Sequence, residues 1–212
     1  MSREDYAAEQ FGSYQAQQHA ARLGMWIFIG TEILLFGGLF CAYAMYRTVY
    51  PEAFLASSRH MDVTIGTVNT FVLLVSSVFV ALALAFIRRG RELLTTVCLV
   101  VAILLGLTFL VLKGVEYAEH ARDHVLPGIW YAVDSPRMPG ASLFITLYFL
   151  MTGLHAIHMT VAVGVLTVLA FRSAAGQFSP TYHAPVELGA MYWHLVDVIW
   201  VFLYPMFYLL AR

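Results

Sequence analysis

The sequence predicts an all-α integral membrane protein, a bundle of five transmembrane helices within a single membrane domain over residues 1–212. Three observations lead to this fold class. Hydrophobic residues make up 60% of the chain. Charged residues make up only 12%, whereas soluble domains hold about 25%. Uncharged or nearly uncharged windows that reach the roughly 20 residues needed to cross a bilayer occur five times.

The five spans follow from the positions of the ionic residues between these windows. We expect them at roughly 23–46, 63–87, 93–115, 141–171 and 188–211, after an extramembrane N-terminal segment over residues 1–22. The longest connection, 116–140, begins with good helix formers, so it should prolong the third span as far as Pro127-Gly128. Trp130 and Tyr131 are then expected at the depth of the lipid headgroups.

The basic turn Arg88-Arg-Gly-Arg-Glu92 sets the predicted orientation. Basic turns stay in the cytoplasm, so we expect the N-terminus inside and Arg212 outside. The first hydrophobic segment does not resemble a cleavable signal, since it begins some twenty residues in and has no small-residue cleavage site. Cys41 and Cys98 lie in separate spans and indicate neither a disulfide nor a metal site. A net charge of −1 gives no reason to expect nucleic-acid binding.

Glu32 is the most informative residue of the chain. It lies about ten residues inside the first predicted span, and at about 1.5 Å per helical residue this is close to the middle of a hydrocarbon layer about 30 Å thick. A charged side chain at that depth costs about 2.5–3.5 kcal/mol on insertion scales, so the carboxyl should be protonated, paired, or facing protein. An intramembrane acid is therefore a candidate functional residue.

The histidines of the last two spans leave two alternatives open. His155 and His158 lie three residues apart and share a helix face, and His194 is followed by Asp197 one turn later. In a haem-binding cytochrome, His155 or His158 would act with His194 as axial ligands. Alternatively, the histidines hydrogen-bond across the bundle, with Asp197 as the partner of His194. The second alternative is favoured, because only His194 is available opposite the fourth span.

Several motifs together resemble subunit III of the haem-copper oxidases. They run in the family's order from Leu23 to the end of the chain: the segment Gly24 to Phe40 around Glu32, Asn69-Thr70 with Ser76-Ser77, Lys113-Gly-Val-Glu116-Tyr117, Thr152-Gly-Leu-His155, and Tyr192-Trp-His194-Leu-Val-Asp197-Val-Ile-Trp200. The last of these is the most specific. Five ordered matches make a chance resemblance improbable.

The resemblance implies an accessory subunit of a proton-pumping terminal oxidase in the bacterial plasma membrane. In that family the haem and copper centres lie in subunit I, and subunit III holds none. It packs against subunit I, in a complex with subunit II and further subunits, binds phospholipid and sustains proton uptake over repeated turnovers. We therefore expect no catalytic residue, metal or redox cofactor in this chain.

The resemblance also carries roles to particular positions. Glu32 matches the family's membrane carboxyl, which reacts with carbodiimide. Five further residues match recurrent polar positions whose expected work is interhelical hydrogen bonding: Glu116, His155, Glu187, His194 and Asp197. Two departures stand out. Many members have seven spans, and this chain begins at what would be their third. In addition, Thr152 stands where the family often has a histidine.

The electron donor separates two branches of the family. The glutamate at position 32 favours a cytochrome c oxidase, and a quinol oxidase is the alternative. A small proton-coupled carrier that uses Glu32 as its titrating group is a third hypothesis. It is disfavoured because the spans show no inverted repeat and no helix broken at mid-depth; Pro205 lies late in the last span.

Overall fold

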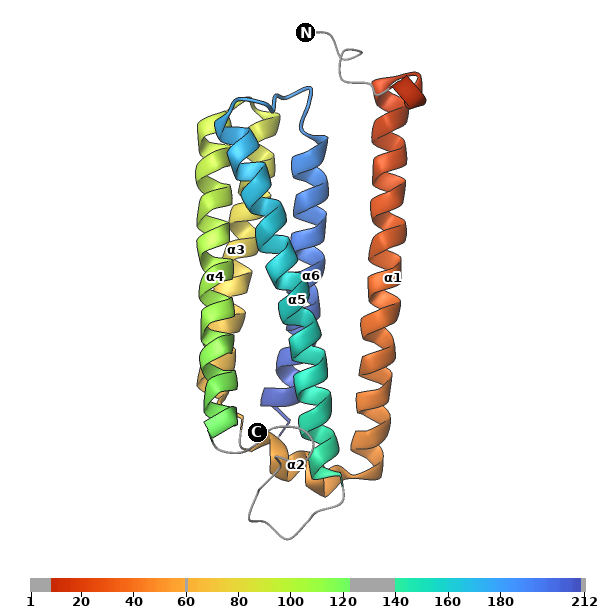
Figure 1. Ribbon diagram of the computed structural model, residues 1–212, viewed down its shortest axis with the longest axis vertical. Helices are drawn as coiled ribbons and strands as arrows, with labels where there is room; N and C mark the ends of the chain where they lie inside the picture. Colours follow the sequence, from red (N-terminus) through yellow and green to blue (C-terminus); the bar gives the residue numbers. More distant parts are fainter. Residues whose placement is uncertain (1–8, 60, 123–139, 211–212) are drawn as a thin grey trace.

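The computed structural model describes residues 9–59, 61–122 and 140–210, and within these residues the regular structure is helical (Figure 1). Five helices are long and apolar enough to cross a membrane, which confirms the predicted all-α bundle. The elements in chain order are η2 (Glu9–Phe11), α1 (Tyr14–Val49), α2 (Pro51–Ser58), α3 (Val63–Arg88), α4 (Glu92–Arg122), α5 (Ala141–Ala174) and α6 (Ala184–Tyr208).

Helix α1 begins nine residues before the predicted start of the first span. The Ser13 hydroxyl caps its first turn by accepting a hydrogen bond from the Ala16 N–H at 3.2 Å. The apolar window marks where a helix can lie in lipid, whereas the cap marks where the helix begins. Pro51 then opens the short helix α2, which buries Phe54 against the aromatic ring of Phe144 in α5.

Helices α3 and α4 form an antiparallel pair joined by the basic turn. Gly90 has a φ of +72°, which is the left-handed conformation that favours glycine at the end of a helix. Farther in, the Thr95 hydroxyl of α4 lies 3.3 Å from the Ala83 carbonyl oxygen of α3 and 3.1 Å from the Arg91 carbonyl oxygen of its own helix, which marks the register of the two helices. Helix α4 continues past its span to Arg122, as expected for the first part of this connection. Residues 127–128, Trp130 and Tyr131, for which a helix end and a headgroup depth were predicted, lie outside the described residues.

Helices α3, α4, α5 and α6 form a closed ring in which each helix contacts the next. The helices approach closely at Gly106 of α4, where an added Cβ atom would lie 2.6 Å from the Trp193 ring. Helix α1 stands beside this four-helix unit and contacts it through α5 and α6 (Figure 1). The start of α1, the α3–α4 turn and the α5–α6 connection lie at one end of the molecule, and α2 lies at the other (Figure 1).

Candidate functional site

A buried ion pair lies between α4, α5 and α6. The Lys113 ammonium donates to Glu116 Oε2 at 2.9 Å, to the Tyr148 hydroxyl at 3.0 Å and to the Tyr208 hydroxyl at 2.8 Å. Both tyrosines donate in turn to Glu116 Oε1, at 2.7 Å and 2.6 Å. Lys113 is 3% exposed and Glu116 1%. All three ammonium protons are therefore used, and the pair carries no net charge.

Aromatic rings enclose the same ammonium. Lys113 Nζ lies 4.9–5.5 Å from the ring centroids of four residues, Tyr117, Tyr148, Trp200 and Tyr208. Cations are attracted to the faces of such rings, and the attraction is stronger where water is excluded. A buried pair is costly to desolvate, so these hydrogen bonds and rings are what make its burial tolerable. The arrangement holds three helices at a fixed register.

Glu32 has its partner on α5. Its Oε2 lies 3.0 Å from His158 Nε2, and the two side chains are 13% and 14% exposed. The opposite ring nitrogen of His158, Nδ1, lies 2.8 Å from the Leu154 carbonyl. Because a carbonyl only accepts, Nδ1 carries a proton, and Nε2 faces the carboxyl at hydrogen-bond distance. The mid-span carboxyl thus faces protein, one of the three states expected from the sequence.

Asp197 and His194 both contact the Ser77 hydroxyl of α3. Ser77 donates to Asp197 Oδ2 at 2.6 Å, and His194 Nδ1 lies 3.3 Å from the same hydroxyl oxygen. The sequence predicted a direct bond between His194 and Asp197, whereas in the structure Ser77 lies between them. The serine has one proton and gives it to the carboxylate, so the imidazole donates from Nδ1. The other carboxylate oxygen, Oδ1, is buried and has no hydrogen-bond partner among the described residues.

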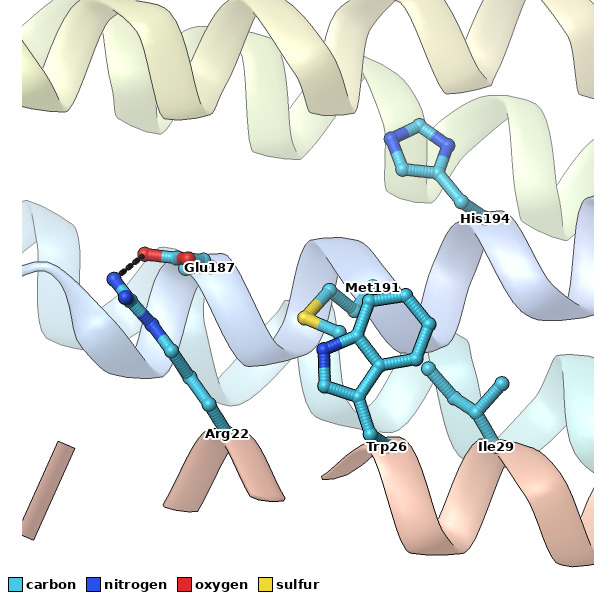
Figure 2. Close-up of a pocket in the computed structure, with 6 residues that line it drawn as sticks. All are labelled: Arg22, Trp26, Ile29, Glu187, Met191 and His194. Carbon is cyan, nitrogen blue, oxygen red and sulfur yellow. Dashed lines mark hydrogen bonds and ion pairs between the residues drawn. The ribbon is translucent and has the colours of Figure 1, made fainter. Parts of the chain in front are cut away.

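Glu187 lies at the end of the molecule that carries the basic turn. Its Oε2 is 3.1 Å from an Arg22 nitrogen and 3.6 Å from an Arg88 nitrogen, with His183 at 4.0 Å. Figure 2 shows Arg22 reaching from α1 to Glu187 on α6. The two residues line a pocket of about 480 Å³ between these helices, whose remaining lining residues are Trp26, Ile29, Met191 and His194.

His155 lies in none of these groups. It is fully buried, and neither ring nitrogen has a hydrogen-bond partner among the described residues. Its ring packs against Phe109 at 5.5 Å and Trp200 at 5.3 Å between centroids. The interhelical hydrogen bond expected for His155 is therefore not formed to any described side chain. His155, His158 and His194 have different neighbours, so the described contacts do not pair them as the haem alternative requires.

The structure thus distributes the predicted polar residues over separate groups instead of one network. The sequence analysis missed Lys113, Tyr148 and Tyr208 as partners of Glu116, and His158 as the partner of Glu32. The spacing Lys113-x-x-Glu116 was a usable signal, since residues three apart on a helix are neighbours. Within the described residues, no three His, Cys, Asp or Glu side chains come together as a possible metal site, and Cys41 and Cys98 are both free.

Comparison with known proteins adds a family to this geometry. A family model described as cytochrome c oxidase subunit III matches residues 6–212. The chain belongs to the cytochrome c oxidase subunit III family. It is 31% identical over 199 residues to a cytochrome c oxidase subunit 3 of Pelomedusa subrufa, covering 90% of this chain and 70% of that protein. It is 30% identical over 209 residues to that of Drosophila melanogaster, covering 93% and 74%.

A bacterial relative is matched more completely along its length. The probable quinol oxidase subunit 3 of Staphylococcus haemolyticus is 26% identical over 191 residues, which cover 90% of this chain and 89% of that protein. The chain is thus subunit III of a haem-copper oxidase, a membrane protein that works within an oxidoreductase complex.

Thr152, where the family often has a histidine, uses its hydroxyl for two hydrogen bonds. It donates to the Tyr148 carbonyl at 2.6 Å, and its oxygen lies 2.5 Å from the Tyr117 hydroxyl. Because the threonine proton goes to the carbonyl, Tyr117 is the donor to Thr152. The hydroxyl therefore connects α4 to α5 beside the Lys113 group.

Proposed function

We propose that this chain is the accessory subunit of a proton-pumping cytochrome c oxidase and has no redox centre of its own. It stabilises subunit I, in a complex with subunit II and further subunits, while haem and copper are held by those partners. The observation that carries this proposal is the pairing of Lys113 with Glu116. The two side chains and their tyrosine partners use up each other's hydrogen-bonding groups in a dry site with no net charge. This supports a structural role, since no group is left free for chemistry.

The pocket between α1 and α6 supports a role in binding phospholipid. Arg22 offers a guanidinium at the membrane surface, and such a group pairs readily with a phosphate. Deeper in the pocket, Trp26, Ile29 and Met191 form an apolar wall along which an acyl chain can lie. A headgroup phosphate would compete with Glu187 for Arg22, at the membrane end where the basic turn also lies.

The pairing of Glu32 with His158 supports a contribution to proton uptake. The two groups lie at hydrogen-bond distance between α1 and α5, inside the membrane, where a proton can pass between them. A carbodiimide reacts with a protonated carboxyl, so we expect Glu32 to be the residue of this chain that such a reagent modifies. The remaining predicted residues, Glu116, Glu187, His194 and Asp197, serve mainly to join helices.

The arrangement of charges supports an orientation with the N-terminus in the cytoplasm, and the bacterial relative supports the bacterial plasma membrane as the location. Arg88, Arg89 and Arg91 form a concentrated basic turn at the same end as the start of α1. Such clusters stay on the cytoplasmic side. Five spans then place the C-terminus outside.

Purification of the complex in mild detergent, through a tag on this chain, tests the proposal. We expect haem-bearing partners, a-type bands in the reduced-minus-oxidised spectrum, and oxygen uptake with reduced cytochrome c. Oxygen uptake with quinol alone would assign the chain to a quinol oxidase, the second candidate, which the extensive match to the Staphylococcus haemolyticus protein favours. A colourless protein without partners would refute both.

A further inference from the structure

Two fully buried polar side chains at the centre of the four-helix unit have no hydrogen-bond partner among the described residues. They are Asn69 of α3 and His155 of α5, each 0% exposed. Both polar atoms of the Asn69 amide and both ring nitrogens of His155 are unpaired. More than nine in ten buried polar groups in proteins have a partner, either protein or ordered water, so four unpaired atoms on two side chains need an explanation.

The register of the helices places these two side chains in one layer. The Thr95 hydroxyl of α4 lies 3.3 Å from the Ala83 carbonyl oxygen of α3, and fourteen residues along each helix from that contact lead to Phe109 and Asn69. The Phe109 ring contacts His155, and both rings contact Trp200 of α6. The Trp200 indole in turn donates to the Thr70 hydroxyl, next to Asn69, at 3.0 Å.

The other polar groups of this layer are already engaged. Thr70 accepts from Trp200 and donates to the Gly66 carbonyl at 2.8 Å. The three ammonium protons of Lys113, one turn of α4 beyond Phe109, go to Glu116 and the two tyrosines. Neither Thr70 nor Lys113 has a proton to offer to Asn69 or His155.

We propose that this layer is a water-binding site in which at least one water molecule bridges Asn69 of α3 and His155 of α5. A direct bond between the two side chains would satisfy one atom of each and leave the others unpaired. Water both donates and accepts, and buried waters in proteins make about three hydrogen bonds to such groups. The amide offers two N–H donors and an acceptor, and the neutral imidazole one of each, so the two side chains complement water.

The site adds a polar connection between α3 and α5, which form no hydrogen bond with each other among the described residues. Around the ring, α3 contacts α4 and α6, and α5 also contacts α4 and α6, so α3 and α5 occupy opposite corners. A bridging water joins them across the centre. Phe109 and Trp200 contribute apolar ring surface to the same layer, beside the bound water.

The first test is a cryo-EM or crystal structure of the purified native complex at a resolution that shows ordered water. We expect density within about 3.2 Å of the Asn69 amide and of a His155 nitrogen. Well-ordered side chains at these positions with no density between them, or a direct bond between the two, would overturn the proposal. This readout does not depend on the electron donor or on the activity of the complex.

Apolar substitution supplies the second test, read as the midpoint temperature at which this chain is lost from the complex. If water bridges the two side chains, Asn69→Leu and His155→Phe should each lower the midpoint by at least about 3 °C, and the double variant should lose less than the sum. If the two groups are dry and unpaired, each apolar replacement should raise the midpoint, because it removes an unsatisfied buried group. That result would refute the site.

Ser76→Ala is the matched control. Ser76 is equally buried on α3, but its oxygen has a described partner, the Trp193 indole N–H at 3.1 Å. Its effect should add to that of His155→Phe, and the density between Asn69 and His155 should remain. If His155→Phe were as non-additive with Ser76→Ala as with Asn69→Leu, the non-additivity would be a property of the whole core. That result would contradict a water shared by Asn69 and His155.

Discussion

Helix α1 and the four-helix unit α3–α6 are held in place by different means. Within an 18-residue apolar window of each helix, 11% of the residues of α1 are buried. The corresponding share is 28–61% for the four helices of the unit. The unit is joined by close packing around Gly106 and by the saturated Lys113 group. Helix α1 keeps most of its surface open to lipid or to partner subunits, so a few specific contacts must decide its position.

Three of the polar contacts of α1 lie at three different depths. Arg22 meets Glu187 at the basic end, Glu32 meets His158 in the middle, and the Tyr43 hydroxyl donates to the Met206 carbonyl near the other end. Consecutive contacts are ten or eleven residues apart along α1, which is about 15 Å. Dense packing tolerates little change at any site, whereas separate contacts can be lost one at a time. Substitutions in the two regions should therefore differ in size.

The largest effect is expected from Lys113→Met, which leaves Glu116 buried without its counter-charge. Removing one partner of a buried pair costs about 3–5 kcal/mol. We expect the thermal midpoint for loss of this chain from the purified complex to fall sharply. The double variant Lys113→Met/Glu116→Gln removes both charges and should recover most of the loss. A double variant as unstable as the single one would show that the aromatic rings need the ammonium itself.

Crowding the centre of the unit should have the next largest effect. In Gly106→Ala, the new methyl group meets the Trp193 ring, and overpacking of this kind costs about 1–3 kcal/mol. The matched control on α1 is Gly30→Ala, where an added Cβ has nothing within 4 Å, so the change should stay within about 1 kcal/mol. The same thermal midpoint measures both. Equal effects would contradict the contrast between the two regions.

Glu32→Gln should have a smaller effect, because the amide N–H can donate a hydrogen bond to His158 Nε2 while Nδ1 keeps its proton on the Leu154 carbonyl. We expect a loss of about 1 kcal/mol or less and normal initial rates of oxygen reduction. Glu32→Lys places an ammonium opposite His158 and should impair assembly instead, measured as the amount of this chain in the purified complex. Complete loss of oxygen reduction in a fully assembled Glu32→Gln complex would refute the accessory role.

The smallest effect is expected at the exposed end of α1. Arg22 is 46% exposed, and exposed ion pairs contribute about 0–1 kcal/mol, so Arg22→Gln should hardly change the thermal midpoint. Bound phospholipid, counted by native mass spectrometry of the complex, should decrease if the guanidinium holds a headgroup. Arg172→Gln, at the same end but outside the pocket, is the control and should retain the lipid. Equal lipid counts in all three forms would contradict the proposed lipid site.

Hydropathy could predict the five spans because each apolar window is a local property of the chain. It could not predict where α1 begins, since the cap at Ser13 lies among polar residues, nor the short helix α2. Glu32 was found as a buried acid from the cost of placing a charge in lipid, whereas Glu116 was found only through the family resemblance. Their partners depend on how each helix is rotated about its axis: Glu32 meets a residue 126 positions away and Tyr148 meets Glu116 across 32. That rotation is set by packing between helices. It therefore depends on residues far apart in the chain and cannot be read from any one apolar segment.

The long sequence separations of the α1 contacts also set an order of events during synthesis. The partners of Glu32, Tyr43 and Arg22 lie 126, 163 and 165 residues later in the chain. At about 5–20 residues per second, His158 is added roughly 6–25 s after Glu32. Throughout this interval the carboxyl of α1 has to enter the bilayer as a neutral acid or stay sheltered by the insertion machinery. The first helix made is therefore the last to be fixed, when α5 and α6 have arrived.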